Sequence, residues 1–194
     1  MLSVLHFRRQ LVGPPVVADV AGILVRNFVV PDDIGPWLVL RDRAMVDERP
    51  RARAWSESDF RSEMINKPWW RADRCWVAVD RDRTTDFVGS VTLAIRESDR
   101  SKVPVVHWLV VDPEWRRRGV GRLLMSHLEL AAWEDGWREI ELETHVGWAA
   151  AVALYHSMGY APVRDRSPRC GLSIFTRPFS SLTRPSASSF STCG

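Results

Sequence analysis

The stretch from Val105 to Leu124, VVHWLVVDPEWRRRGVGRLL, constrains the fold of this chain more than any other. It joins an apolar run, typical of a buried strand, to three arginines, to Gly119 and Gly121, and then to a helical pattern. A strand that turns directly into a helix points unpaired backbone N–H groups outward at the positive end of the helix dipole. A Cβ at either glycine would hold an anion away from those groups. The stretch therefore predicts an anion site.

Other interpretations of this stretch stay open at this point. The arginines could form a solvated face beside glycines that only close a turn, or they could contact nucleic acid. A Walker loop would need Gly-Lys-Ser/Thr, and a dinucleotide fingerprint would need a third glycine, and both are missing. The whole chain has 27 Lys+Arg against 24 Asp+Glu, for a net charge of +3. This balance argues against a uniform nucleic-acid coat, so no nucleic-acid partner is predicted.

Hydrophobic periodicity predicts an α/β fold with a mixed sheet. The helix that begins after Gly119 lies between the predicted strands at Val103–Val111 and Glu139–His145, which makes these two strands parallel. The other predicted strands are Gly22–Val30, Cys75–Val79 and Phe87–Ile95, the last two forming an antiparallel hairpin, and Cys170–Phe175. The other predicted helices run through residues 37–44, from a cap at Ser56, and over Ala149–Met158.

Length and composition predict a single domain. At 194 residues and 45% hydrophobic, the chain is long enough for one well-buried domain, expected at residues 21–179. Residues 1–20, which contain Pro14 and Pro15, are expected to form a poorly ordered arm outside the core, and the Ser-rich residues 180–194 a tail. The 3 cysteines have no CxxC pair, which favours a reduced, cytoplasmic protein without a metal. No apolar run approaches the roughly 20 residues that span a bilayer.

Two strings give the sequence a resemblance to a known family. LVVDPEWRRRGVGRLL is similar to the Arg/Gln-x-x-Gly-x-Gly/Ala pyrophosphate loop of the GNAT superfamily of acyl-CoA N-acyltransferases, and AVALYHSMGY resembles its A-x-x-L-Y-x-x-x-G-F/Y helix ending. The match is strong over residues 105–162 and weaker over 22–104. The resemblance implies a mixed central sheet of six to seven strands flanked by about four helices. It also implies an acetyltransferase in which an amine attacks acetyl-CoA directly in a ternary complex.

The resemblance also implies which residues bind acetyl-CoA. Backbone groups of Leu109, Val110 and Val111 would meet the pantetheine arm, with the Leu109 N–H donating to the thioester carbonyl. The pyrophosphate would be wrapped by Arg116, Arg117, Arg118, Gly119, Val120, Gly121 and Arg122. Tyr155 falls on the family's tyrosine that protonates the departing thiolate, and the alternative is a packed helical aromatic.

A general base is also required, because a substrate ammonium must lose a proton before it attacks. Glu143 falls where some family members carry a glutamate, and the alternative is a salt-bridged strand residue. Val105 occupies a second position at which family members carry the base, and a valine cannot accept a proton. His107 is therefore the second candidate for the base. His127, in the apolar stripe of its helix, fits a core histidine better. Trp148 stands where many members have an asparagine, so cofactor contacts there must be rearranged.

The acceptor is predicted only as an amine of a small molecule or of a peptide or protein. The helices that follow the first predicted strand are rich in tryptophan, and the loop-like Lys67–Trp70 could present an aromatic wall to an amine. The expected state is a monomer or homodimer. The alternative function is a catalytically silent acyl-CoA-binding or sensory module, which would follow if neither Tyr155 nor Glu143 faced the thioester.

Overall fold

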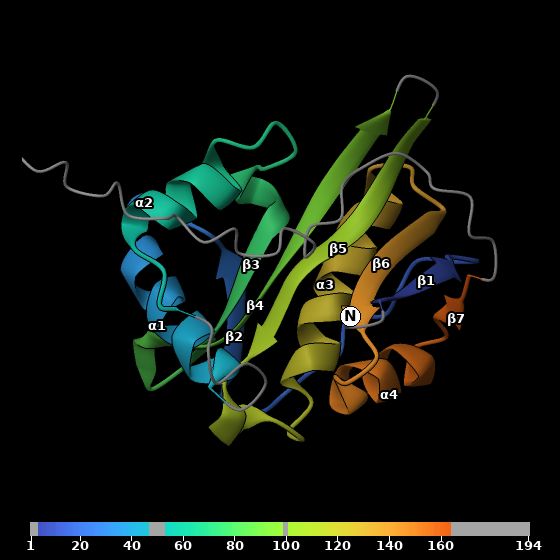
Figure 1. Cartoon of the computed structure of the whole chain (residues 1–194). Helices are drawn as coiled ribbons and strands as arrows, with labels where there is room; N and C mark the ends of the chain where they lie inside the picture. Colours follow the sequence, from blue (N-terminus) through green and yellow to red (C-terminus); the bar gives the residue numbers. More distant parts are fainter. Residues whose placement is uncertain (1–3, 47–52, 99–100, 164–194) are drawn as a thin grey trace, which may run out of the picture.

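The computed structural model describes residues 4–46, 53–98 and 101–163. Seven strands form one mixed sheet in the order β2-β3-β4-β5-β6-β1-β7 (Figure 1). All neighbours are antiparallel except β5 and β6, which are parallel and joined through α3. The strands are β1 (Val4–Gln10), β2 (Ile23–Asn27), β3 (Cys75–Asp80), β4 (Arg83–Ser98), β5 (Ser101–Val111), β6 (Glu139–His145) and β7 (Ala161–Pro162).

In the described part of the chain, four α-helices flank the sheet. They are α1 (Ile34–Met45), α2 (Glu57–Phe60), which continues into the π-helical η1 (Arg61–Ile65), α3 (Val120–Glu134) and α4 (Ala149–Ser157). Two 3₁₀ turns, η2 (Ala72–Arg74) and η3 (Pro113–Trp115), precede β3 and α3. The predicted mixed α/β sheet of six to seven strands with about four helices is therefore confirmed.

The sheet separates two hydrophobic cores, because successive side chains of a strand point to opposite faces. Along β3, Cys75 and Val77 pack with α1 and α2 in what we call the first core. Trp76 and Ala78 pack with α3 on the other face, in the second core. The second core also contains residues of α4, β1 and β6. Figure 1 shows α1 and α2 over the β2–β4 side of the sheet.

Most of the predicted elements are found, with small shifts at their ends. The predicted cap at Ser56 is confirmed. Its side chain accepts a hydrogen bond from the Asp59 N–H, and the Asp59 carboxylate accepts one from the Ser56 N–H, which makes a capping box. Gly136, with a φ of +88°, follows α3, as is common for a glycine after a helix end. The polar turn between β3 and β4 is shorter than predicted, since β4 begins at Arg83. The predicted strand at Cys170–Phe175 and the Ser-rich tail lie outside the described residues.

The prediction of an N-terminal arm over residues 1–20 is wrong for β1. This strand lies between β6 and β7, and its Phe7 is 1% exposed within the second core. Arg9 donates to both carboxylate oxygens of Glu129 on α3 at 2.7 Å, and Glu129 is 2% exposed. Leu5, Phe7 and Arg9 alternate along the strand, so one face of β1 supplies apolar groups and a partner for a buried carboxylate.

Residues 11–22 connect β1 to β2 at the opposite edge of the sheet, and they do so across α3. The Leu11 N–H donates to the Arg138 carbonyl at 2.8 Å, and the Ala18 N–H donates to Ser126 Oγ on α3 at 3.0 Å. Val17, Ala18 and Val20 pack against the second core. The connection is thus part of the packed structure rather than an arm.

Candidate active site

A β-bulge interrupts β5 at Trp108. Ser90 of β4 pairs with Val110, but Thr92 pairs with His107, so Trp108 and Leu109 lie opposite one residue of β4. The φ of Trp108 is +49°, which is unusual for a bulky residue and is held by surrounding packing. Its indole contacts the rings of Trp37 and Trp55 at centroid distances of 5.6 and 5.0 Å. The bulge changes the direction of the backbone at Leu109.

β5 and β6 diverge just before this bulge. Their parallel pairing is confined to Val105 with Glu141 and Val106 with Leu142. Beyond Val106, β5 is not paired with β6 within residues 4–46, 53–98 and 101–163. An extended ligand could hydrogen-bond to such an open edge in the way an added strand does. Leu109, Val110 and Val111, which were predicted to meet pantetheine, lie on this segment.

The predicted anion loop follows β5 at the start of α3. Arg117 and Gly119 have φ values of +65° and +89°, and both are exposed. The first helical bond runs from the Leu123 N–H to the Gly119 carbonyl. The N–H groups of Val120, Gly121 and Arg122 therefore belong to the first helical turn, which has no intrahelical acceptors for them. The loop has the geometry expected of a diphosphate cradle.

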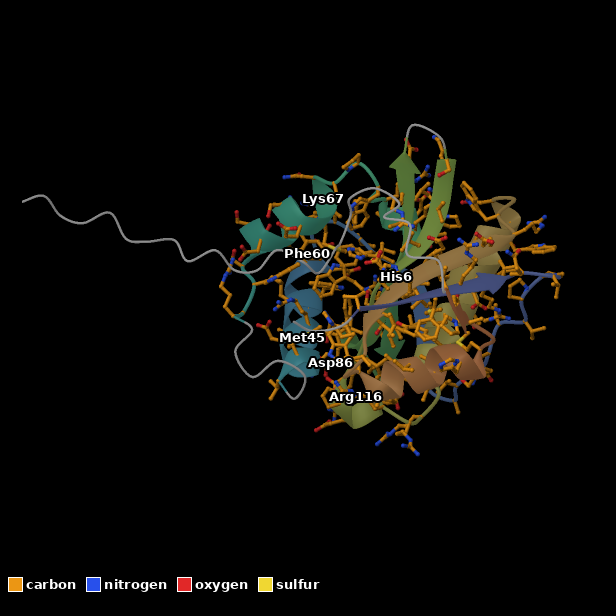
Figure 2. All side chains as sticks on the ribbon, turned by 45° about the vertical axis from the view of Figure 1, so that its right-hand side comes forward. His6, Met45, Phe60, Lys67, Asp86 and Arg116 are labelled. Carbon is orange, nitrogen blue, oxygen red and sulfur yellow. The ribbon has the colours of Figure 1, made fainter. Side chains whose placement is uncertain are left out.

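The four arginines of this loop do different things. Arg116 Nη2 donates to the Ala44 carbonyl at 3.0 Å, next to Met45 at the end of α1 (Figure 2). This bond ties the loop to the other layer of helices. Arg118 lies over the Trp115 ring at 5.0 Å, and Arg122 Nη2 donates to Ser157 Oγ of α4 at 2.7 Å. Arg117 is exposed at the tip of the loop. The four arginines thus lie in or next to the loop, and Arg116 also connects the loop to α1 by a hydrogen bond.

Gly121 has a packing reason as well as its place in the cradle. A Cβ there would lie 3.1 Å from Leu154 Cδ2 on α4 and 3.8 Å from Val111 Cγ2 on β5. A larger side chain at this position would push α3 and α4 apart. Substitutions of Gly121 therefore perturb folding together with any bound phosphate, and the exposed arginines give a cleaner test of the cradle.

Tyr155 lies on α4 within the second core. It is 6% exposed, and its ring centroid is 6.3 Å from that of Phe7 and 5.9 Å from that of Tyr160. Burial raises the pKa of the Tyr155 phenol, because the charged phenolate would lose its hydration. The hydroxyl therefore stays protonated at neutral and mildly alkaline pH, as a general acid must. The position fits either the predicted acid or the packed aromatic that sequence left open.

Glu143 and Glu141 lie on the face of β6 that points toward α1 and α2, and they have different surroundings. Glu141 accepts from Arg8 of β1 at 2.7 Å and forms a close ion pair with Arg96 of β4. Glu143 has only longer contacts, at 3.5 Å to Arg96 and 3.5 Å to His6. Desolvation raises the pKa of Glu143, despite the opposing effect of His6 and Arg96, and the nearby Glu141 adds to the rise. Glu141 is therefore fixed by close ion pairs, whereas Glu143 is the less tightly paired carboxylate and the better candidate for proton transfer.

His107, the reserve base, is buried against Trp69, with the two ring centroids 4.5 Å apart. Its Nε2 has no hydrogen-bond partner. Burial, with a smaller effect of Lys67, lowers the pKa of His107 to about 3. The imidazole is therefore neutral but holds a captured proton poorly, which makes it a weaker candidate base than Glu143.

A cavity of about 170 Å³ opens on the same face of the sheet. Its lining residues are Pro68, Trp69, Ala94, Ile95, Arg96, Glu97 and Val105. Figure 2 marks Lys67, just before the Pro68–Trp69 wall, and His6 on β1, whose imidazole contacts Glu143. Trp69 thus forms an aromatic wall of this cavity. Trp37 is fully buried and Trp70 packs edge-on against Phe28, so these two tryptophans belong to the first core.

The sequence matches the Acetyltransferase (GNAT) family over residues 42–160, which is more than half of the chain. The chain belongs to the GNAT acetyltransferase family. A mycothiol acetyltransferase of Salinispora arenicola is 31% identical over 160 residues, which cover 80% of this chain and 50% of that protein. The [ribosomal protein bS18]-alanine N-acetyltransferase of Salmonella typhimurium is 42% identical over 52 residues, 27% of this chain and 35% of that protein. The chain spans about half the length of the mycothiol acetyltransferases that it matches.

Solved structures have the same fold. A GCN5-related N-acetyltransferase from Sphaerobacter thermophilus superposes with a TM-score of 0.66 at 20% identity, over 82% of this chain and 48% of that one. The ribosomal-protein-S18-alanine N-acetyltransferase from Escherichia coli gives a TM-score of 0.52 at 22% identity, over 71% of this chain and 76% of that one. The GNAT match begins inside α1, so β1 and β2 precede it.

Sequence reasoning missed two residues of this GNAT domain. Arg96 continues the alternation of Thr92 and Ala94 on β4, and this period of two was the available signal that it faces the site. Glu129 lies among the apolar residues of α3, where a carboxylate demands a partner. Among the described residues, no helix is long and apolar enough to cross a membrane.

Proposed function

We propose that this chain is an acetyl-CoA-dependent N-acetyltransferase that acts on a primary amine of a small molecule, peptide or protein. The GNAT family implies acetyl-CoA as co-substrate. The observation that carries the proposal is the combination of an open, bulged strand and an anion cradle in one strand-to-helix connection. A long ligand with a diphosphate at one end and a thioester at the other fits such a connection.

Acetyl-CoA, when bound, supplies an activated acetyl group on a thiol that can leave. The amides of Val120 to Arg122 and the exposed Arg117 would hold its diphosphate. The Leu109 N–H, redirected by the bulge, would donate to the thioester carbonyl and stabilise the negative charge that develops there. With these contacts, the acetyl group would lie in the opening between β5 and β6.

Two side chains would then move protons on opposite sides of that opening. Glu143, on the α1–α2 face, would accept a proton from the acceptor ammonium and leave a neutral amine able to attack. Tyr155, in the core on the other face, would donate its hydroxyl proton to the departing thiolate. Direct attack in a ternary complex needs no acyl-enzyme, and neither group serves as a nucleophile.

Acetyl-CoA should stabilise the parent protein against thermal unfolding by roughly 2.7 kcal/mol at a hundredfold excess over Kd. Arg117→Glu should greatly reduce this stabilisation, because a carboxylate at the loop tip repels the diphosphate. The matched control is Arg81→Glu, in the exposed turn between β3 and β4. Equal acetyl-CoA shifts in the two variants would reject the role of the loop arginine, and no shift in the parent would reject the cradle.

Glu143→Gln should lower kcat/KM by about 10²-fold at pH 7, with the deficit shrinking as pH approaches the amine pKa near 10.4, where the acceptor loses its proton unaided. Because the Glu143 pKa is raised, activity of the parent should fall as pH drops through a value above the usual 4.5. That acidic limb should disappear in the Gln variant. An unchanged pH–rate profile would move the base role to His107 or water.

Four finer statements belong to this proposal. The acceptor is a primary amine of a small molecule, peptide or protein, the reaction uses no metal, the protein is a monomer or homodimer, and it acts in the cytoplasm. If acetyl-CoA binds but no amine is consumed in a screen for free CoA thiol, the silent acyl-CoA-binding module replaces the enzyme. Light scattering decides the oligomeric state.

A further inference from the structure

We propose that the cavity of about 170 Å³ beneath Trp69 holds an apolar group of the acceptor, so that preferred substrates are amines carrying a ring-sized or branched hydrocarbon substituent. This inference rests on the proposed function and adds the class of amine. Nothing in the family match or in the relatives assigns this cavity a ligand.

The walls of the cavity are mainly hydrocarbon. Pro68 and Trp69 form one side, and Ala94 and Val105, paired across β4 and β5, form the floor. An apolar protein cavity of about 150 Å³ accommodates benzene, so the volume suits one aromatic ring or a branched chain. Trp69 is positioned by its edge contact with the buried His107 ring, which fixes that wall in place.

The charged end of the cavity indicates how the occupant is oriented. Arg96 lines the cavity and also reaches Glu143 at 3.5 Å, so the cavity ends beside the proposed base. The ladder across β4, β6 and β1 contains two arginines and one histidine against three glutamates, an excess of one negative charge when the imidazole is neutral. Its members are His6, Arg8, Arg96, Glu139, Glu141 and Glu143. An ammonium is attracted to that end, and the hydrocarbon part is left for the apolar walls.

Hydroxylated acceptors should fit this cavity poorly. A hydroxyl placed against Ala94 and Val105 would exchange its hydrogen bonds to water for contact with methyl groups. A small polar amine would leave the hydrocarbon walls unfilled. Hydrocarbon contacts of this kind change kcat/KM by about 10–200-fold. The cavity should therefore discriminate by apolar size, with the amine end common to all substrates.

The experiment compares kcat/KM of the parent for 2-phenylethylamine and ethanolamine at saturating acetyl-CoA, with a preference for 2-phenylethylamine of about tenfold or more expected. Ala94→Leu, which fills the cavity, should lower kcat/KM for 2-phenylethylamine about tenfold more than kcat/KM for ethanolamine, mainly through KM. Ala161→Leu makes the same chemical change at an exposed position of β7 and should alter neither. Should Ala94→Leu fail to fold, Trp69→Leu removes one wall and should lower the same preference.

A second readout separates this inference from the proposed function. Without acetyl-CoA, 2-phenylethylamine should shift NMR signals of the parent, and Ala94→Leu should abolish those shifts. If both amines are acetylated equally well, or if Ala94→Leu slows the acetylation of both alike, the cavity is not a substrate subsite, although the proposed acetyltransferase activity holds. If 2-phenylethylamine binds in an Ala94-dependent way but no amine is acetylated, the cavity assignment holds and the proposed function fails. Absence of any Ala94-dependent binding overturns the inference.

Discussion

Tyr155→Phe is expected to lower kcat by about 10²–10⁴-fold, the usual contribution of a general acid. The change removes only the hydroxyl and keeps the ring that packs beside Phe7 and Tyr160. Burial raises the pKa of the Tyr155 phenol, so the hydroxyl keeps its proton until the thiolate departs and can accept it. A steady-state assay of thiol release at saturating acetyl-CoA measures kcat, with acetyl-CoA affinity expected to stay near the parental value.

The chain offers a matched control for this variant, since it has only 2 tyrosines. Tyr160→Phe makes the same change in the same core, at a ring 5.9 Å from that of Tyr155. Its kcat should be near the parental value. If Tyr155→Phe also turns over at the parental rate, Tyr155 is a packing residue. If instead it melts far below Tyr160→Phe, its hydroxyl has a structural role.

Arg9→Met should destabilise the fold by about 3–5 kcal/mol, because it leaves the carboxylate of Glu129 buried without its partner. Both oxygens of Glu129 accept from Arg9 at 2.7 Å, and the residue is 2% exposed. A loss of this size should lower Tm by about 10 °C in a protein of this length. Chemical denaturation measures the free energy of unfolding.

Two further variants decide whether the buried carboxylate is the cause. Arg8→Met, on the neighbouring residue of β1, removes ion pairs to the more exposed Glu139 and Glu141 and should cost much less. Adding Glu129→Leu to Arg9→Met removes the unpaired charge and should restore most of the stability. If the double variant is as unstable as Arg9→Met alone, the loss comes from packing of the arginine stem.

The parts of the fold that were predictable are those encoded by neighbouring residues. The residues of the proposed cradle are continuous in sequence, from the apolar strand through Gly119 to the start of α3. The strand, turn and helix patterns therefore all predict the same local structure. The place of β1 could not be predicted in this way. Its contacts join residues such as Arg8 and Glu141, which are 133 positions apart. No local pattern specifies a partner at that distance, whereas Pro14 and Pro15 suggested an arm.

The candidate site was predictable to a similar extent. The period of two along β6 indicated correctly that Glu141 and Glu143 share a face. The difference between them depends on Arg8 and Arg96, which come from β1 and β4, and so required the assembled sheet. The bulge at Trp108 carries no local signal, because tryptophan rarely adopts a positive φ and does so here through rings from distant segments.

The position of β1 has a consequence for the order in which the protein is made. This strand precedes every other described strand in the chain, yet its two neighbours, β6 and β7, are the last two. During synthesis, the antiparallel strands β2 to β5 can pair as they emerge, while β1 has no edge to join until residues 139–145 have left the ribosome. Such distant pairing slows folding. Until β6 emerges, the apolar side chains of Phe7 and Leu11 therefore remain exposed in the nascent chain, where a chaperone can bind them.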